Sequence, residues 1–190
     1  MQPSVSVVIP VLNEERFLAQ SVNAILNQNY DGQIEVILAL GPSIDNTNQV
    51  AQDLAKDNRV KLIQNPTGKT AAALNNAIKN SKFEIIVRLD GHAIVDENYV
   101  KNAIESLNQT NADNVGGLMK AEGISDFEKS VAAAMTSKFG VGNAPFHIGG
   151  KLGEVDTVYL GTFKKSALED RKSTRLNSSH SQQSRMPSSA

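Results

Sequence analysis

The sequence of 190 residues contains no cysteine and no tryptophan, and aromatic residues make up only 5% of it. The absence of cysteine excludes disulfide bonds and thiolate metal sites. The formal net charge is −1, so the charge gives no reason to expect a nucleic-acid partner. The longest apolar run, Val5 to Leu12, is interrupted by Ser6 and Pro10 and is far too short to span a bilayer. The remaining composition is ordinary for a soluble globular protein.

Three common nucleotide and hydrolase motifs are also missing. Gly68-Lys69-Thr70 matches the end of a P-loop, but that motif needs a glycine five residues earlier, where Ile63 stands. No Gly-x-Gly-x-x-Gly follows the first expected strand, which disfavours a Rossmann dinucleotide site. No Gly-x-Ser-x-Gly elbow occurs either, so a hydrolase triad would have no nucleophile.

Hydrophobic periodicity predicts strands that alternate with helices. The expected strands are Ser4–Ile9, closed by Pro10, then Ile34–Leu40, Val60–Ile63, a buried strand around Ile85–Val87, Val115–Met119 and Val155–Leu160. The expected helices are 17–28, with Asn13 as N-cap of the segment that opens it, 47–57, capped by Asp45, then 70–80, 96–107 and 126–136. This alternation predicts an α/β fold with a mostly parallel sheet flanked by helices.

The stretch Phe83–Ala93 is the most informative part of the chain. Its β-branched run Ile85–Val87 suits a strand that is buried on both faces. Asp90, Gly91 and His92 follow at once, and ligands bind at the carboxyl edge of open α/β sheets. Alternate residues of an extended segment share a face, so Asp90 and His92 could both turn toward one divalent ion. The simpler alternative is a strand followed by a polar turn.

The predicted topology also brings other polar residues to this edge. Right-handed crossovers place the loops after the first, second and fourth strands on a common side of the sheet. These loops carry Asn13, Glu14, Ser43, Asp45, Asp90 and His92. The glycine-rich segment 139–151 is expected to form a long loop in which His147 could face the crevice, and Asp156 is a further candidate site residue.

Residues 170–190 differ in composition from the rest of the chain. They are almost free of apolar residues and show no periodicity, which is typical of a disordered tail. Back-translation of 170–180 and 184–190 gives DNA that resembles a common sequencing-library adapter, with 181–183 where its variable index would lie. We therefore expect one domain over 1–169 that is cut at its C-terminal side, followed by a non-native tail over 170–190. A natural polar tail is the alternative.

Five short motifs occur in a fixed order. They are Val-Val-Ile-Pro-Val-Leu-Asn-Glu-Glu at 7–15, Glu-Val-Ile at 35–37, Ser43 with Asp45-Asn46-Thr47, Ala-Ala-Ala-Leu-Asn at 71–75 and Arg-Leu-Asp-Gly-His at 88–92. Together they closely resemble the family 2 glycosyltransferases of the GT-A fold, in particular the bacterial exopolysaccharide-type branch. The resemblance covers 4–169, and each motif alone would be weak.

The resemblance implies inverting transfer of a sugar from a nucleotide diphosphate sugar to a saccharide or lipid-linked acceptor, in cell-surface or exopolysaccharide synthesis, with Mg²⁺ or Mn²⁺. It implies donor-binding roles for Pro10, Asn13, Glu14, Ser43, Asp45, Lys69, Asn75, Arg88 and Asp90. Asp90 and His92 occupy the metal motif, which is normally Asp-x-Asp in the family, and the metal would neutralise the diphosphate leaving group. The expected location is cytoplasmic, with the inner face of the plasma membrane left open.

Two departures from the family pattern matter. Many relatives have paired aspartates after the second strand, one of which reads the base, but Leu40 and Gly41 stand here. The family's catalytic base lies beyond the point where the resemblance ends, and nothing in 1–169 matches it, so Asp156 is not assigned that role and this fragment is expected to be inactive. A sugar nucleotidyltransferase is an alternative, although Asn13-Glu14-Glu15 stands where its glycine-rich loop would be. A non-catalytic nucleotide-sugar-binding module is another.

Overall fold

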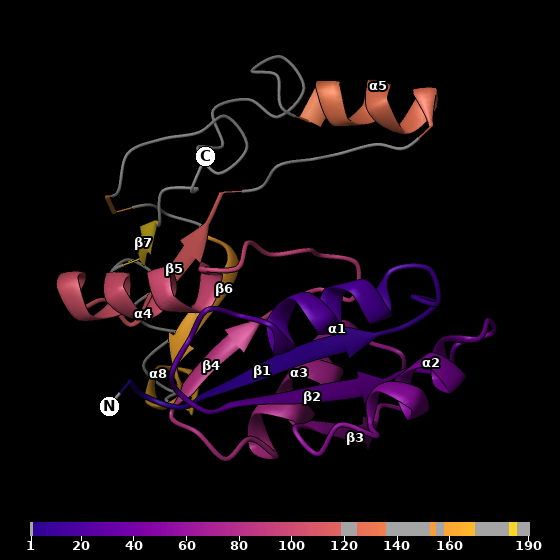
Figure 1. Ribbon diagram of the computed structural model, residues 1–190, viewed down its shortest axis with the longest axis horizontal. Coiled ribbons are helices and arrows are strands. Elements are labelled where there is room, and N and C mark those ends of the chain that lie inside the picture. The colour runs from indigo at the N-terminus through magenta and orange to yellow at the C-terminus, as the bar shows by residue number, and fades with distance from the viewer. Residues whose placement is uncertain (1, 119–124, 136–152, 155–157, 170–182, 186–190) are drawn as a thin grey trace.

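The computed structural model describes residues 2–118, 125–135, 153–154, 158–169 and 183–185. One sheet runs through this part of the chain, with strand order β3-β2-β1-β4-β6-β5-β7 (Figure 1). The strands are β1 (Val5–Val11), β2 (Ile34–Leu40), β3 (Val60–Gln64), β4 (Ile85–Arg88), β5 (Asn114–Gly117), β6 (Tyr159–Lys164) and β7 (Gln183–Arg185). The helices are α1 (Leu18–Leu26), α2 (Thr47–Leu54), α3 (Thr70–Lys79), α4 (Tyr99–Thr110), α5 (Asp126–Met135) and α8 (Lys165–Glu169).

The first four strands confirm the predicted parallel arrangement. β1 lies between β2 and β4, and β2 pairs with β3, all in parallel. β6 is antiparallel to both of its neighbours, β4 and β5. The sheet is therefore mixed and mostly parallel, as expected for an α/β fold.

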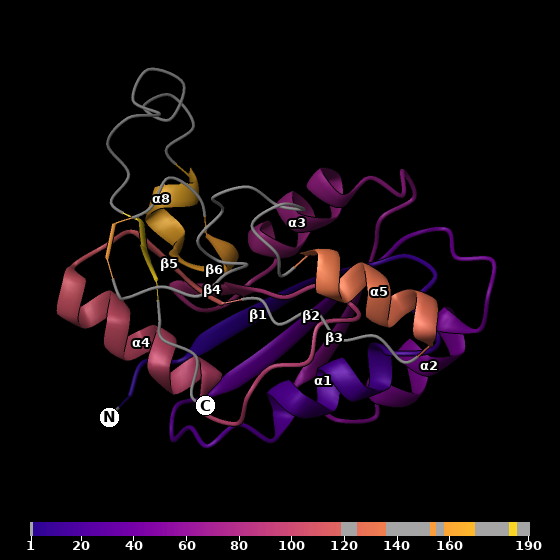
Figure 2. The ribbon, with the colours of Figure 1, turned by 90° about the horizontal axis from the view of Figure 1, so that it is seen from above.

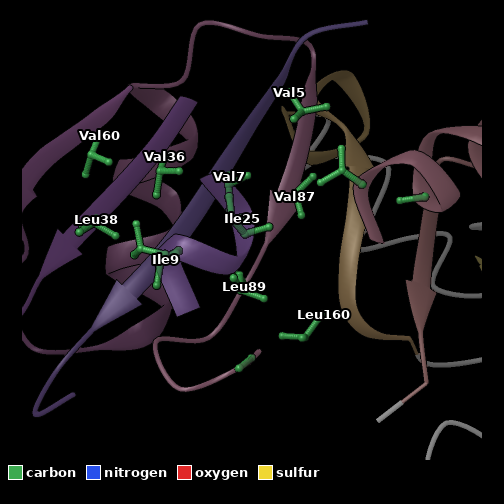
Figure 3. Packing of buried hydrophobic residues seen from close by; sticks show 14 of the residues in the cluster. Val5, Val7, Ile9, Ile25, Val36, Leu38, Val60, Val87, Leu89 and Leu160 are labelled. Carbon is green, nitrogen blue, oxygen red and sulfur yellow. The ribbon is translucent and has the colours of Figure 1, made fainter. Parts of the chain in front are cut away.

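Helices cover both faces of the sheet (Figure 2). On one face, strand residues such as Val7, Ile9 and Val87 pack with Leu18 and Ile25 of α1 in the larger core cluster (Figure 3). On the other face, Ala73 and Ala77 of α3 pack against β1, β2 and β4. Because both faces are covered, the central strands are apolar almost throughout, which is why they read as continuous hydrophobic runs.

Pro10 does not end the first strand, which corrects the sequence expectation. β1 continues to Val11, and Pro10 pairs with Ala39 of β2. The carbonyl of Val8 accepts a hydrogen bond from the backbone N–H of Leu89 at 3.1 Å, so the backbone groups of Val8 point toward β4. Pro10 is two residues further along the strand, and its backbone nitrogen therefore points to the same side. The ladder with β4 reaches only to Val8, so the N–H that proline lacks would point beyond that ladder.

The last strands also differ from the expectation. The strand expected over 155–160 is instead β6, which begins at Tyr159 and is held by pairs such as Ile86 with Phe163. Gln183–Arg185, inside the segment expected to be disordered, pair with β5 as the short strand β7. An open sheet edge offers backbone groups that pair with little regard to side chains. That 170–190 is non-native stays a prediction.

Candidate functional site

The loop after β1 is fastened to the loop after β2 by three consecutive backbone donors. The N–H groups of Asn13, Glu14 and Glu15 donate, in that order, to side-chain oxygens of Ser43 (3.0 Å), Thr47 (2.7 Å) and Asp45 (3.3 Å). The second loop returns two bonds: the N–H of Ile44 donates to Asn13 Oδ1 at 2.9 Å and that of Asn46 to Glu15 Oε2 at 2.8 Å. The predicted meeting of these loops is thus confirmed.

Asn13 does not cap α1, contrary to the sequence expectation. The helix begins at Leu18, and Phe17 takes the N-cap position without a side-chain hydrogen bond. Asn13 adopts a left-handed backbone with φ of 55°, a conformation that asparagine tolerates better than most residues. The side chain of Asn13 accepts a hydrogen bond from the loop after β2 instead. An asparagine at this position is therefore explained by the contact between the loops and not by helix capping.

The carboxylate of Asp45 accepts several hydrogen bonds in this pair of loops. Its Oδ1 accepts hydrogen bonds from the hydroxyl of Thr47 at 2.5 Å and from the N–H of the same residue at 3.1 Å. These bonds, led by the Thr47 hydroxyl, hold the pKa of Asp45 below its ordinary value. Asp45 therefore supports the start of α2 as predicted, although Asn46 occupies the N-cap position.

The segment after β4 turns beside the same loops. The N–H of Ala93 donates to the carbonyl of Asp90 at 3.0 Å, which closes a turn over Asp90–Ala93. The hydroxyl of Ser21 on α1 also donates to that carbonyl at 3.3 Å. Gly91 lies so close to Glu14 that a Cβ added there would be 2.8 Å from Glu14 Cγ. The structure thus brings the Asp-Gly-His motif against the loop after β1.

Asp90 carries the charge of this edge and has a cation beside it. Nη2 of Arg88 donates to Asp90 Oδ1 at 3.1 Å, with the arginine side chain 41% exposed and the aspartate side chain 25% exposed. Tyr159 of β6 lies near enough to Asp90 and Arg88 for their charges to act on its pKa. Burial, and secondarily the charge of Asp90, raise the pKa of Tyr159, while Arg88 lowers it. The antiparallel strand β6 therefore adds a wall to the site.

His92 is held by the carboxylate of Glu14. Its Nδ1 lies 2.8 Å from Glu14 Oε1, with the glutamate side chain 17% exposed and the imidazole 60% exposed. A carboxylate offers only acceptors when ionised, so this contact favours a hydrogen on Nδ1. The second ring nitrogen, Nε2, makes no hydrogen bond to the described residues.

The donor set fits a metal ion that arrives with phosphate oxygens. Asp90 offers a carboxylate oxygen, which suits Mn²⁺ and Mg²⁺, and His92 offers an imidazole nitrogen, a ligand of transition metals. Within the described ranges, no three His, Asp or Glu side chains are gathered as a closed metal site. Mg²⁺ in nucleotide sites commonly has one or two protein ligands and takes the rest from phosphates and water.

Three other expected donor-site residues lie in different places. Pro10 is part of β1, just before the interlocked loop. Lys69 is the N-cap of α3 at the same edge, where its N–H donates to Thr67 Oγ1 at 3.3 Å. Asn75 is exposed within α3 and contributes nothing to the hydrogen-bonded group around Asp90 in the described part of the chain. Asp156 and His147 lie outside the described residues.

Sequence reasoning missed two residues of this group. Glu15 appeared only as part of the motif at 7–15, but it joins the two loops through its backbone and its side chain. Tyr159 was not singled out, because nothing in the order of elements shows that a late strand inserts beside β4. Thr47 was present in a quoted motif, and its short spacing from Asp45 was the available signal.

Comparison with known proteins decides the family. The model of "Glycosyl transferase family 2" matches residues 6–171. The chain belongs to glycosyl transferase family 2. Its relatives within the family include the succinoglycan biosynthesis protein ExoA of Rhizobium meliloti, 31% identical over 146 residues, which are 75% of this chain and 44% of ExoA. The putative glycosyltransferase EpsE of Bacillus subtilis is 41% identical over 92 residues, 47% of this chain and 33% of EpsE. The chain thus spans less than half the length of these relatives.

Solved structures place the fold among GT-A glycosyltransferases. S. aureus TarS 1-349 superposes with a TM-score of 0.70 at 16% identity, covering 100% of this chain and 59% of that one. The mannosyltransferase PcManGT of Pyrobaculum calidifontis, solved with GDP-Man and Mn²⁺, gives 0.66 at 21% identity, covering 93% and 47%. No helix in the described ranges is long and apolar enough to cross a membrane.

Proposed function

We propose that this chain is the donor-binding part of an inverting glycosyltransferase. It would hold a nucleotide diphosphate sugar at the edge formed by the loops after β1, β2 and β4, with Asp90 and His92 ligating Mg²⁺ or Mn²⁺. Membership of family 2 favours glycosyl transfer over the sugar nucleotidyltransferase alternative. The relative ExoA, a succinoglycan biosynthesis protein, supports a role in exopolysaccharide or cell-surface synthesis. A saccharide or lipid-linked acceptor and a cytoplasmic location belong to the same proposal.

The observation that carries this proposal is that three consecutive backbone donors of the loop after β1 are already used by the loop after β2. In dinucleotide-binding folds this loop and its helix start bind the pyrophosphate through N–H groups. Here the N–H groups of residues 13–15 already donate to the second loop. Other groups would therefore balance the diphosphate charge, and a divalent ion ligated by Asp90 and His92 beside this loop would supply positive charge there.

Each residue of the site has a separate role in the proposed binding of the donor. A divalent ion, when bound, supplies Lewis-acid charge that stabilises the diphosphate as it leaves. Asp90 and His92 would ligate it, and Arg88, now paired with Asp90, would be free to turn to a phosphate oxygen. Lys69 at the start of α3 is a second cation at the same edge. Asn13, Ser43 and Asp45 fix the loops around the nucleoside.

Transfer itself needs more than the described residues offer. Inverting transfer requires a carboxylate that deprotonates the acceptor hydroxyl opposite the leaving group, a contribution of roughly 10²–10⁴-fold. No residue in the described part of the chain is placed in that role, and Asp156 remains a candidate only. We therefore expect this chain to bind donor with little or no turnover.

Isothermal titration calorimetry of UDP and GDP, with and without Mn²⁺, tests the donor site. We expect binding that requires Mn²⁺ and is lost in Asp90→Ala, while Asp53→Ala on the exposed face of α2 binds like the wild type. Metal-independent binding that survives in Asp90→Ala would contradict the proposal. Assays of sugar transfer with the same samples and a panel of nucleotide sugars would show no product, and brisk transfer would mean that the base lies within this chain.

A non-catalytic binding module is the second candidate, and one observation favours it. Leu40 and Gly41 stand where many relatives carry base-reading aspartates, so selectivity among nucleotides is expected to be low. Donor hydrolysis separates the two candidates, because a catalytic donor site hydrolyses nucleotide sugar slowly in the absence of acceptor. A module would bind the donor and leave it intact.

A further inference from the structure

The contact between Glu14 and His92 joins two segments that are 78 residues apart in the sequence. Glu14 Oε1 accepts from His92 Nδ1 at 2.8 Å, and the glutamate side chain is largely buried at 17% exposure. Nε2 has no partner among the described residues, and the imidazole is 60% exposed. Nδ1 of the ring is therefore held by Glu14, and Nε2 is accessible to a ligand.

Glu14 is itself held on several sides, so it can serve as a rigid support. Its N–H donates to Thr47 Oγ1 at 2.7 Å, and its carbonyl accepts from the N–H groups of Phe17 (3.1 Å) and Leu18 (2.9 Å). Its side chain packs over Gly91, where even one added methyl group would lie 2.8 Å from Cγ. A carboxylate fixed this way keeps its direction when a ligand binds.

We propose that Glu14 is a positioning residue that acts on the donor through His92. It holds the ring in the tautomer with hydrogen on Nδ1, so that the lone pair of Nε2 is presented to the divalent ion that accompanies the diphosphate. The inference rests on the proposed function of the site. Carboxylates that accept from a metal-ligating imidazole fix its tautomer and raise its basicity. Glu14 thereby compensates for a neutral histidine standing where an Asp-x-Asp motif has a second charged ligand.

The arrangement has a consequence for the choice of metal. Mg²⁺ is bound mainly through oxygen ligands and keeps several waters, whereas Mn²⁺ belongs to the first-row transition metals that also bind sites with nitrogen ligands. With Glu14 holding a nitrogen ligand in place, the site favours Mn²⁺ over Mg²⁺. His92→Asp, which restores two carboxylates, should shift the ratio of Mn²⁺ to Mg²⁺ affinity toward Mg²⁺ and should make the affinity insensitive to Glu14.

The tautomer can be measured without metal or nucleotide. Long-range ¹H–¹⁵N NMR spectra of the full chain distinguish hydrogen on Nδ1 from hydrogen on Nε2. The chain has three histidines, and His92→Gln identifies the signal of His92 by its loss. We expect Nδ1–H in the wild type and a shift toward Nε2–H in Glu14→Ala. Hydrogen on Nε2 in the wild type would overturn the inference.

A double-mutant cycle then measures the coupling in Mn²⁺ affinity, by calorimetry in the presence of UDP. Glu14→Ala should weaken Mn²⁺ binding by about 10–100-fold. It should cause no further loss when His92 is already alanine. Glu105→Ala, an exposed glutamate on α4, is the matched control and should bind as the wild type. An equal loss in both backgrounds would show that Glu14 contacts the nucleotide directly, and would refute the positioning role.

A conservative variant guards against loss of folding. Glu14→Gln keeps the packing over Gly91 and an acceptor oxygen without the charge, so the tautomer should persist and Mn²⁺ affinity should fall less than in Glu14→Ala. An Nε2–H tautomer in Glu14→Gln would contradict the inference. Absence of any Mn²⁺-dependent nucleotide binding in the wild type would instead refute the proposed function, and the NMR result on the tautomer would still stand.

Discussion

At the scale of single residues, the site depends on close approach between the Asp-Gly-His motif and the loop after β1. Gly91 permits it because it has no Cβ to meet Glu14. Glu14 in turn contacts His92, and Arg88 contacts Asp90. The absence of a side chain at Gly91 thus makes room for the glutamate that contacts His92, one of the two candidate metal ligands.

Gly91→Ala should damage the donor site far more than the fold. The added methyl group would lie 2.8 Å from Glu14 Cγ and displace the glutamate from His92. Overpacking costs about 1–3 kcal/mol in a tight core, and less is expected here because the neighbouring imidazole is exposed. We expect weaker Mn²⁺-dependent UDP binding, measured by calorimetry. Gly153→Ala, which meets nothing within 4 Å, is the control, and equal effects of the two changes would contradict this account.

At the scale of elements, the loops after β1 and β2 behave as one unit. Five hydrogen bonds join residues 13–15 to residues 43–47: three backbone donors of the first loop and two of the second each meet a side chain from the other loop. Asp45 ties this unit to the first turn of α2 through Thr47. The nucleoside would therefore meet a preformed wall.

The depressed pKa of Asp45 predicts how this unit responds to acid. Because its pKa is lower in the folded state than the ordinary value of 3.8, its contribution is fully present above that value and is lost as the pH falls below it. Protection of the amides of residues 13–15 against hydrogen exchange, taken relative to the intrinsic exchange rate at each pH, should fall below this pH in the wild type. Asp45→Asn should exchange faster already at neutral pH and lose the acid dependence. An unchanged acid response in the variant would assign it to another carboxylate.

A buried group of hydrogen bonds around Glu35 lies at the starts of β1, β2 and β4, at the end of these strands away from the candidate site. Glu35 on β2 is only 8% exposed, and its Oε1 accepts from Ser6 Oγ at 2.5 Å and from the N–H of Lys82 at 2.6 Å. Ser6 Oγ accepts in turn from the N–H of Phe83 at 3.1 Å. These bonds fix the entry into β4, far along the strand from Asp90.

Removing this group of hydrogen bonds should affect stability and leave the donor site intact. Glu35→Ala leaves a buried hydroxyl and a backbone N–H without an acceptor, which costs about 1–3 kcal/mol for each unsatisfied group. Urea denaturation should show a loss of that order, while UDP binding of the folded variant stays as in the wild type. Glu35→Gln, which keeps an acceptor, should lose less. A loss of nucleotide binding without a loss of stability would contradict the structural role.

At the scale of the whole molecule, the sequence predicted those features of the fold that follow from hydrophobic periodicity and from the order of strands and helices. Ile85–Val87 indicated a buried strand, and Asp90 and His92 were placed at its end, because strand period and chain order determine both. The insertion of β6 between β4 and β5 was not predictable, since antiparallel pairing of a late strand leaves no mark in the order of elements. Tyr159 was missed for that reason. Asn13 was misassigned as a helix cap because capping and loop bridging use the same side-chain chemistry.

The central claim is that a divalent ion with a nucleoside diphosphate binds at the edge between the loop after β1 and the end of β4. Paramagnetic broadening by Mn²⁺ in the presence of UDP measures this location directly in a ¹H–¹⁵N spectrum of the chain. We predict loss of the amide signals of Asn13–Glu15 and Asp90–His92, with Lys82 and Phe83 at the far end of β4 retained. Broadening centred elsewhere, or unchanged in Asp90→Ala, would contradict the account.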